Sequence, residues 1–374
     1  MRILVAPQEF KGSLSAEEAA VAITRGIRES RPQWTVDQLP LSDGGPGFLE
    51  ALRHAVKADT AGLAVHDALG RRVLGRYLVL RGSRVAVVEA AQANGLYHLA
   101  PLELDPLGAD SFGVGELILA AAAGRPPGIV VGVGGSATTD GGAGMARALG
   151  ARFLDVDGRE LGSGGAPLVD LARIEWVRPP AFDGIDIVVA TDVTNPLVGA
   201  SGAAAVYGPQ KGATPAQVAL LEAALVRYAA VVEECLEVQI ARLAGAGAAG
   251  GLAGGLVAFL GARVRSGFAF VAEATGLADR LGQADVVVTG EGSFDAQSLQ
   301  GKGTGRIRAM AREAEKPCFV FAGVSAVDEP GVRTLAGIEP DRAQSMANAA
   351  ALLEEVAARW GADFEDHGAA QASN

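Results

Sequence analysis

Acidic and amide side chains recur in this sequence immediately after short apolar runs, each within a glycine-rich stretch. Glycine lets backbone amides approach an anion closely and lets the chain turn sharply. If the apolar runs are parallel strands, these side chains lie at the carboxyl edge of a sheet, where open α/β sheets bind ligands. Several carboxylates at one edge repel each other, so the pattern favours a cation or ligand that uses them. The residues are Asp43, Asp140, Asp192, Asn195, Glu291 and Asp295.

Three lysines complement these acids, and each is followed by a glycine: Lys11, Lys211 and Lys302. A lysine ammonium neutralises phosphate charge, and carboxylates bind Mg²⁺ directly or through water. Carboxylates for a metal and lysines for phosphate are together the parts that phosphoryl transfer requires. The combination therefore predicts a phosphotransferase.

Each of these residues also has an ordinary structural interpretation. Asp43 or Asp140 could cap a turn, and Asp295 could cap a helix. Asp192 could belong to a turn, and Lys11 could be a solvated surface residue. The functional interpretation rests on the combination of these residues and not on any one of them.

Composition restricts the class of protein. The 374 residues suit two domains, and 49% of them are apolar, enough to bury a large core. The formal net charge of −11 argues against a nucleic-acid-binding surface. Cys235 and Cys318 are the only cysteines, so we expect two buried thiols in a reducing cytoplasm. The apolar stretch around 241–260 is broken by glycines and predicts a buried loop and helix, with no membrane contact.

Two common nucleotide-binding signatures are absent from the sequence. Nothing reads Gly-x-x-x-x-Gly-Lys-Ser/Thr, and no Gly-x-Gly-x-x-Gly fingerprint follows the first apolar run. The four histidines lie outside the glycine loops, which disfavours a Ser/His/Asp hydrolase.

Strand–loop–helix alternation predicts mainly parallel sheets with helices on their faces. Residues 63–90 break this rhythm and predict an antiparallel β-meander, which suits an inserted domain. Ser15 and Glu18 predict a capping box for a helix over 16–30. Other helices are expected at 304–315 and, opened by Thr214, over 215–244. The expected strands are Ile3–Ala6, Gly128–Val133, Ile185–Ala190, Ala284–Thr289 and Cys318–Ala322.

Over about residues 1–360 the chain resembles the glycerate kinase family, the bacterial type with two α/β domains. Several glycine-rich motifs carry the resemblance, and all occur in order along the chain. The motifs are Ala6–Ser15, Asp43–Gly47, Gly113–Ile118, Gly132–Gly142, Asp192–Leu197, Tyr207–Pro215, Gly245–Leu252, Thr289–Gly292 with Asp295, and Gly301–Lys302.

The resemblance implies a fold and a reaction. The fold is a flavodoxin-like parallel-sheet domain built from both chain ends, residues 1–62 and 280–374, with a second α/β domain inserted at 63–279. The reaction is ATP-dependent phosphorylation of D-glycerate, leaning to the 2-hydroxyl, by direct transfer with Mg²⁺. The resemblance places the site in a cleft between the two domains.

Roles for individual residues follow as hypotheses from this mechanism. Asp192 or Asp295 would orient or deprotonate the substrate hydroxyl, and Lys11 would hold phosphate or the substrate carboxylate. Asp43 and Glu291 would meet Mg²⁺, directly or through water. The nucleotide or phosphate contacts expected are Gly12, Ser13, Gly134, Gly135, Ser136, Asp140, Lys211 and Lys302.

The chain departs from the family pattern in three places, one of which is Thr139, where Asn is common. Gln8-Glu9 stands where the family usually carries Asp-Ser, and Asp105–Ser111 replaces a more basic, threonine-rich stretch. Two alternatives therefore stay open, a kinase for another small hydroxy acid and a non-catalytic ligand-binding protein on the same scaffold. A nicotinamide-dependent oxidoreductase is a third, suggested only by the α/β class.

Overall fold

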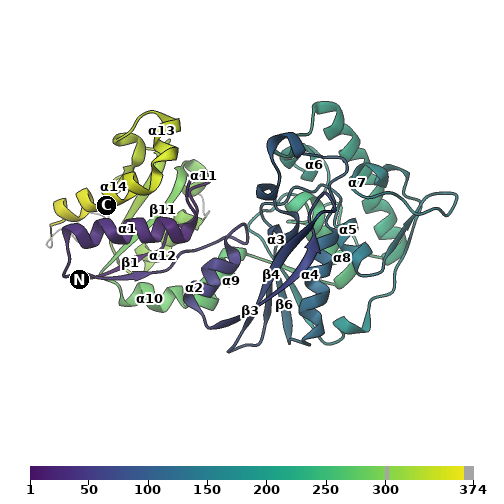
Figure 1. Ribbon diagram of the computed structural model, residues 1–374, viewed down its shortest axis with the longest axis horizontal. Coiled ribbons are helices and arrows are strands. Elements are labelled where there is room, and N and C mark those ends of the chain that lie inside the picture. Colours follow the sequence, from purple (N-terminus) through teal and green to yellow (C-terminus); the bar gives the residue numbers. More distant parts are fainter. Residues whose placement is uncertain (300–302, 366–374) are drawn as a thin grey trace. The chain divides into compact units, whose positions relative to one another are not determined.

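The computed structural model describes residues 1–299 and 303–365, and the chain divides into two compact units. The first unit contains residues 1–42, 50–56 and 268–374, and the second contains 43–49 and 57–267. Both are drawn in Figure 1. The sequence-based boundaries at 62–63 and 279–280 differ from this division. The reasons are that β3 begins at Ala58, and that residues 268–279 pack with the first unit.

The first unit is built on a five-stranded parallel sheet of order β13-β12-β11-β1-β2. Strands from both chain ends are neighbours in it, because Ile3 of β1 pairs with Val286 of β11. The apolar residues of β1 are fully buried, as expected for a central parallel strand covered on both faces. The strands are β1 (Arg2–Val5), β2 (Thr35–Gln38), β11 (Val286–Phe294), β12 (Cys318–Ser325) and β13 (Val332–Thr334).

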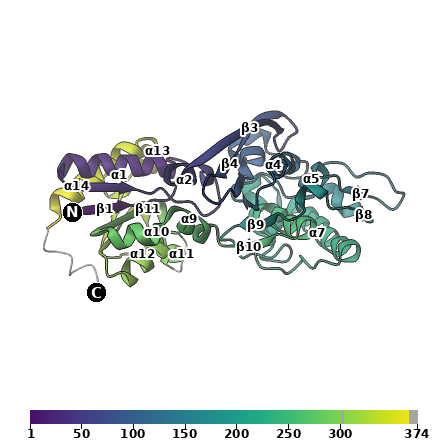
Figure 2. The same cartoon turned by 90° about the horizontal axis from the view of Figure 1, so that it is seen from below.

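Helices cover both faces of this sheet. Figure 2 shows α1 and α14 on one face and α10 and α12 on the other. The predicted capping box opens α1, with the Ser15 amide and hydroxyl both donating to Glu18 Oε2 at 2.8 Å. The helices are α1 (Ala16–Ser30), α2 (Phe48–Ala55), α9 (Gly267–Thr275), α10 (Leu277–Gln283), α11 (Ala296–Leu299), α12 (Gly303–Glu313), α13 (Arg342–Ala347) and α14 (Ala349–Asp363). The chain passes between the units after residue 42, within α2, after residue 56 and at the start of α9.

The second unit is built on a six-stranded mixed sheet of order β10-β9-β6-β5-β4-β3. Its β3-β4-β5 part is antiparallel, which confirms the predicted meander, and the remaining pairs are parallel. The strands of this sheet are β3 (Ala58–His66), β4 (Arg72–Leu80), β5 (Ala86–Glu89), β6 (Gly128–Gly132), β9 (Asp186–Ala190) and β10 (Arg263–Arg265). Strands β7 (Arg152–Leu154) and β8 (Arg173–Glu175) form a separate antiparallel pair. The helices are α3 (Ala91–Asn94), α4 (Phe112–Ala123), α5 (Ala143–Ala148), α6 (Ala203–Tyr207), α7 (Pro215–Leu236) and α8 (Leu252–Leu260). Short 3₁₀ helices include η5 (Pro209–Lys211) and η6 (Ala248–Gly251).

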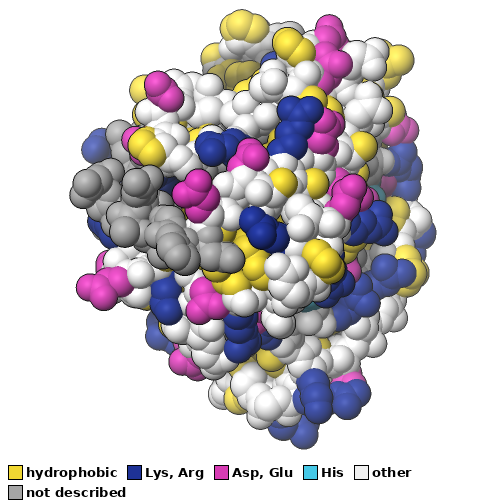
Figure 3. Space-filling view, turned by 90° about the vertical axis from the view of Figure 1, so that its left-hand side faces the viewer, with side chains coloured by type: hydrophobic (Ala, Val, Ile, Leu, Met, Phe, Trp, Pro, Cys, Tyr) yellow, Lys and Arg dark blue, Asp and Glu magenta, His cyan; other side chains and the backbone are white. Residues whose placement is uncertain are grey.

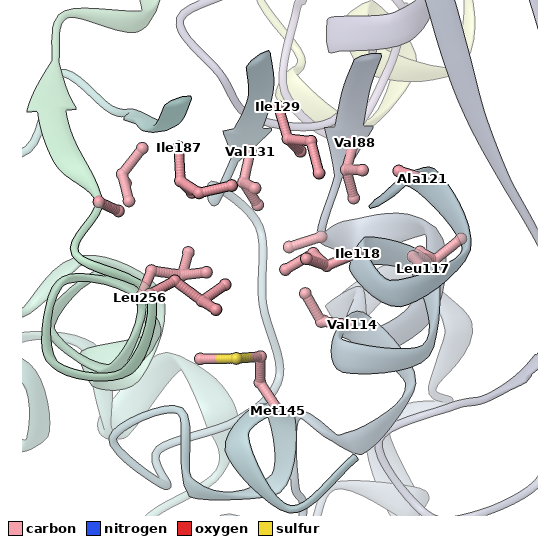
Figure 4. Packing of buried hydrophobic residues seen from close by; sticks show 14 of the residues in the cluster. Val88, Val114, Leu117, Ile118, Ala121, Ile129, Val131, Met145, Ile187 and Leu256 are labelled. Atoms are coloured by element: carbon pink, nitrogen blue, oxygen red, sulfur yellow. The ribbon is translucent and has the colours of Figure 1, made fainter. Parts of the chain in front are cut away.

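The core of the second unit lies between the sheet and helices α4, α5 and α8. Figure 4 shows Ile118 of α4, Val131 of β6 and Leu256 of α8 pointing toward one another, with Met145 of α5 beneath them. A second buried cluster surrounds α7 and includes Tyr228. The glycine loops between these elements are thus supported by packed apolar layers.

Three expectations from the sequence are wrong in detail. Helix α7 ends at Leu236 and not near 244, because Glu237 adopts a left-handed conformation and the chain returns to bury Ile240 in the core. Strand β11 runs to Phe294, because it pairs with β12 as far as Ser325, so Glu291 lies inside the strand. Cys235 is exposed, at the end of α7.

Helix α7 is the one helix within residues 1–299 and 303–365 that is long and apolar enough to cross a membrane by length and composition. Its residues Leu221, Tyr228 and Val232 are fully buried in the second unit. The Tyr228 hydroxyl donates to the Gly141 carbonyl at 2.9 Å. These contacts give α7 a place in the core of a folded unit.

The close approach of α1 to α14 depends on Gly26. A Cβ at position 26 would lie 2.0 Å from the Glu354 carbonyl oxygen of α14, and backbone cannot move aside cheaply. We expect Gly26→Ala to lower the free energy of unfolding by about 1–3 kcal/mol, although alanine favours isolated helices. The matched control is Gly282→Ala in α10, where a Cβ meets open space and a gain of about 0.5–1 kcal/mol is expected. Urea denaturation measures both, and a stabilised Gly26→Ala protein would contradict the packing.

Candidate active site

In the first unit, a tight turn after β1 carries Lys11. Phe10 is buried, and its carbonyl accepts hydrogen bonds from the amide and hydroxyl of Ser13 and from the amide of Leu14. Gly12 takes a left-handed conformation at the turn, and Lys11 beside it is exposed. The turn thus presents the lysine side chain, whereas the polar groups of Ser13 are used within the turn itself.

Glu291 and Asp295 also belong to the first unit, near the end of β11. Burial raises the pKa of Glu291, while the nearby side chains of Ser298 and Thr304 and the charge of Lys11 act in the opposite direction. Asp295 Oδ1 accepts the Ser298 amide at 3.1 Å, so this carboxylate also begins α11. The first unit therefore brings together three of the predicted residues, namely Lys11, Glu291 and Asp295.

In the second unit, two glycine loops touch at the carboxyl ends of β6 and β9. The Gly134 amide donates to the Gly44 carbonyl at 3.0 Å, and a Cβ at Gly134 would lie 2.5 Å from Gly45. A Cβ at Gly44 would lie 2.5 Å from the carbonyl oxygen of Ala190. Only glycine allows these backbones to approach so closely. The contact places Asp43 and the exposed Gly135 at the same edge of the sheet.

Asp192 follows β9 at that edge and is held by a neighbouring strand. The Ser266 hydroxyl, just after β10, donates to Asp192 Oδ1 at 2.6 Å. The Thr191 amide donates to the Arg265 carbonyl at 3.0 Å, and this hydrogen bond fixes the backbone just before Asp192 to the backbone just before Ser266. Ser266 is a positioning residue that the sequence did not reveal, because its only local signal is a serine after a short strand.

Asn195 is oriented by its own loop. Its amide nitrogen donates to the Ser201 carbonyl, and its Oδ1 accepts the Tyr207 hydroxyl, each at 2.8 Å. This side chain therefore shapes the loop after β9, and the ordinary structural interpretation accounts for both of these hydrogen bonds.

Asp140 lies in the interior of the second unit with no exposed surface. Its Oδ2 accepts the amide and hydroxyl of Ser111 at 2.9 and 2.7 Å and the Gly144 amide at 3.0 Å, while Oδ1 accepts the Gly142 amide at 3.0 Å. Hydrogen bonds to an ionised acceptor are strong. The carboxylate thus joins the starts of α4 and α5 and supports the glycine loop from within.

Lys211 is equally buried, with 2% of its surface exposed. Its ammonium donates to the Thr138 carbonyl and lies 3.4 Å from the Ser136 hydroxyl. Asn94, on the other side of the loop, donates to the Thr138 hydroxyl at 3.1 Å. The loop is therefore clamped by buried side chains at Ser136–Thr138, and only Gly134 and Gly135 reach the surface.

The remaining predicted residues are placed as follows. Lys302 lies outside the described residues. Asp43 Oδ1 accepts the Gly45 amide at 3.2 Å within its own turn. Among residues 1–299 and 303–365, no group of three or more Asp, Glu, His or Cys side chains is arranged to hold a metal ion alone. Asp110, in the altered 105–111 stretch, is nearly buried, and burial with the nearby charge of Asp140 raises its pKa.

Comparisons with known proteins decide the family. The sequence profile described as the glycerate kinase family matches residues 3–366. The chain belongs to the glycerate kinase family. It is accordingly a phosphotransferase of the glycerate kinase type, which confirms the activity expected from the sequence, and ATP use is what the family implies.

Similar proteins and a solved structure cover nearly the whole chain. It is 39% identical to glycerate kinase of Halalkalibacterium halodurans over 95% of this chain and 96% of that protein. It is 41% identical to glycerate 2-kinase of Escherichia coli over 91% and 89%. A crystal structure assigned as glycerate kinase 2 from Salmonella typhimurium superposes with a TM-score of 0.78 at 40% identity, covering 97% of both chains.

Removing the charge of Asp140 tests its role in holding the loop. In the unmodified protein, amide and hydroxyl donors point at both oxygens of the Asp140 carboxylate. In Asp140→Asn one of these oxygens is replaced by an NH₂ group, which is itself a donor and cannot accept their hydrogen bonds. We expect the free energy of unfolding to fall by about 2–3 kcal/mol. Asp183→Asn, at an exposed position, is the control and should change stability by less than about 0.5 kcal/mol. Equal stability of the two variants in urea would remove Asp140 from the framework.

The buried Lys211 should give stability a distinctive pH dependence. Desolvation lowers its pKa from 10.5 to about 7, with the Asp140 charge opposing the shift. Between these values the unfolded chain keeps the proton and the folded chain has lost it, so folding releases a proton and raising the pH favours the folded state.

The measurement is urea denaturation at several pH values between 7 and 10. The free energy of unfolding should rise with pH less steeply in Lys211→Met than in the unmodified protein, because the Lys211 ammonium is missing. The exposed control Lys57→Met should show the full rise. If both variants follow the unmodified protein, Lys211 does not titrate in this range.

Proposed function

We propose that this chain transfers the γ-phosphoryl group of ATP directly to the 2-hydroxyl of D-glycerate, with Mg²⁺ bound to the triphosphate. Family membership supports the substrate and the phosphoryl donor. The 2-position is supported by the name glycerate 2-kinase of the Escherichia coli relative at 41% identity. The observation that carries the proposal is this relationship over nearly the full length of the chain.

We also infer that the first unit is a flavodoxin-like domain built from both chain ends. What supports this is the strand order β2-β1-β11-β12-β13, which in the order of the unit's own strands reads 2-1-3-4-5. The second α/β unit is then an insertion between the strands of the first. The cytoplasm remains the proposed location.

In this mechanism the glycerate hydroxyl oxygen attacks the γ-phosphorus in line with the departing ADP. The bond between the γ-phosphorus and the bridging oxygen breaks, and the hydroxyl proton passes to a carboxylate. Asp192 is our first choice for that carboxylate, since the Ser266 hydroxyl holds one of its oxygens and fixes its direction. Asp295 is the second choice, and Lys11 would neutralise phosphate or carboxylate charge on the same ligands.

Phosphate contacts are divided between exposed backbone and buried support. Gly12, Gly134 and Gly135 are the glycines proposed to approach the triphosphate. The triphosphate would be supported indirectly by Ser136, Asp140 and Lys211, which fix the loop behind Gly135. Ser13 would contribute by shaping the turn that carries Lys11. Lys302 is retained as a phosphate contact from the sequence alone.

Carboxylate oxygens are the ligands that Mg²⁺ prefers, and Asp43 and Glu291 offer them. Because Mg²⁺ bound to a triphosphate keeps several waters and needs few protein ligands, two separate carboxylates acting directly or through water are compatible with this ion. The metal would neutralise charge that develops on the transferred phosphoryl group.

The proposal involves small-molecule ligands without nucleic acid or membrane partners. On the face drawn in Figure 3, both basic side chains (Lys and Arg) and acidic side chains (Asp and Glu) are exposed. The net charge of −11 argues against a nucleic-acid partner.

Product analysis tests the reaction. The protein is incubated with D-glycerate, ATP and MgCl₂, and phosphorus NMR identifies the product. A single 2-phosphoglycerate signal with stoichiometric ADP is expected. A 3-phosphoglycerate signal would overturn the assigned position, and no ADP release would overturn the kinase.

Asp192→Asn tests the proposed base. Because a positioned general base contributes about 10²–10⁴-fold, kcat should fall at least about 100-fold with little change in the KM values. Ser266→Ala should cause a smaller loss, since it only loosens the orientation of Asp192. Asp183→Asn, in an exposed turn before β9 and so at the opposite end of that strand from Asp192, should retain full activity. Near-normal turnover of Asp192→Asn would transfer the role to Asp295.

One observation favours a second candidate, a kinase for another small hydroxy acid. Gln8 is an amide at a position where the resemblance implies a carboxylate, at the end of β1. Comparing kcat/KM for glycerate, lactate and 3-hydroxypropionate decides between the candidates, and glycerate should be the best substrate.

A further inference from the structure

Among the described residues of the first unit, Trp360 Nε1 and three further buried polar atoms have no hydrogen-bond partner, and these three come from separate segments that meet near the ends of β1 and β11. They are Nε2 of Gln8, Oε1 of Glu291 and Oγ1 of Thr304. Buried polar groups are nearly always paired, because leaving one unpaired costs stability. Three such atoms gathered in one place point to a ligand that would pair with them.

Backbone and packing contacts bring the three together. The backbone N–H of Gln8 donates to the Gly290 carbonyl at 2.8 Å, and this hydrogen bond sets Gln8 beside Glu291. The Gln8 side chain lies against Gly303, where an added Cβ would be 1.8 Å from Nε2. Thr304 is the next residue and lies in the first turn of α12, with no exposed surface. The Thr304 side chain also lies beside the Glu291 carboxyl, where it opposes the larger effect of burial, which raises the pKa of Glu291.

The place has the topology of a ligand site. β1 and β11 are adjacent parallel strands, but the chain continues from β1 to β2 on one side and from β11 to β12 on the other. In open α/β sheets, the crevice at the carboxyl ends of two such strands is where ligands bind. Gln8 follows β1, and Glu291 lies near the end of β11.

The chemistry of the three atoms is specific. Gln8 Nε2 can only donate a hydrogen bond, an ionised Glu291 oxygen can only accept one, and the Thr304 hydroxyl can do either. An alcohol hydroxyl both accepts and donates, so it complements a donor beside an acceptor. A carboxylate or phosphate group could satisfy Gln8 but would be repelled by Glu291.

We propose that Gln8, Glu291 and Thr304 form a subsite for an alcohol hydroxyl of a bound substrate, with Gln8 as a specificity-determining residue. Gln8 donates to the hydroxyl oxygen, and the hydroxyl donates to Glu291. The inference rests on the proposed function, because glycerate and the ribose of ATP are the hydroxyl-bearing ligands that it supplies.

Three variants of the full chain test the subsite. Gln8→Glu replaces the donor by an acceptor, and Thr304→Val removes the hydroxyl at nearly constant volume. Gly303→Ala displaces the Gln8 amide, and the fold should tolerate it because the clash is with the end of a flexible side chain. Gln283→Glu, an exposed Gln in the same unit that contacts Arg2, is the matched control.

Losing one hydrogen bond to the ligand should raise one KM by about three- to tenfold in each test variant, with the control unchanged. If the hydroxyl belongs to glycerate, the KM for glycerate rises. Lactate lacks the 3-hydroxyl of glycerate, and 3-hydroxypropionate lacks the 2-hydroxyl. The inhibition constant of the analogue that lacks the bound hydroxyl should then be the same for the variants and the unmodified protein. If the hydroxyl belongs to ribose, the KM for ATP rises in the variants. With the deoxy-ATP that lacks that hydroxyl, either 2′-deoxyATP or 3′-deoxyATP, variant and unmodified protein should then have the same KM.

Unchanged KM values for both substrates, with only a shift in thermal stability, would overturn the subsite and assign these atoms to bound water. A change only in the Mg²⁺ concentration needed for half activity, with both KM values unchanged, would overturn the subsite and leave Glu291 with the proposed metal role alone. If the unmodified protein does not phosphorylate glycerate, calorimetric titration of the same variants with glycerate and with ATP still tests the subsite. The failure of the reaction is thereby separated from the failure of the inference.

Discussion

Parallel pairing between β1 and β11 is the interaction on which the first unit depends. It joins the two ends of the chain in one sheet, with Ile3, Leu4 and Val5 beside Val286, Val287 and Val288. The register also fixes what lies beyond the strands, because it sets Gln8 next to Gly290. A slip of one residue would turn every side chain of β1 to the opposite face. The polar groups at this edge are therefore positioned by apolar pairing several residues away.

The second unit uses buried charge for a similar purpose. Asp140 binds backbone amides at the starts of two helices, and Lys211 binds a carbonyl of the same loop from the other direction. Neither charge faces solvent, so each must be compensated inside the protein. The result is a rigid base beneath Gly134 and Gly135, two residues with no side chains to interfere with a ligand.

Local patterns were sufficient to predict many elements of the fold. Apolar runs located β1, β6 and β9, the Ser15–Glu18 pair located the start of α1, and the change of rhythm after residue 63 located the meander. Non-local effects were not predictable. The extension of β11 past Glu291 depends on β12, and the end of α7 depends on a return of the chain to the core without a Gly or Pro signal.

The candidate site divides in the same way. Residue type and spacing selected Asp192, Glu291 and Lys11, but they could not tell which side chains point inward. Lys211 has the sequence environment of a phosphate ligand, and its burial follows from the packing of η5 against the loop. Ser266 and Thr304 were missed, because a serine or threonine beside a short element is too common to single out.

The first unit cannot be completed until most of the chain has been synthesised. β1 leaves the ribosome long before the strand it needs, β11, which begins only at Val286. At about 5–20 residues per second, the wait lasts roughly 15–60 s. The second unit, which lies almost wholly between the two strands, has time to fold in the interval. During that time the apolar amino-terminal strand has only β2 beside it and exposes an edge, which makes it a natural binding site for chaperones.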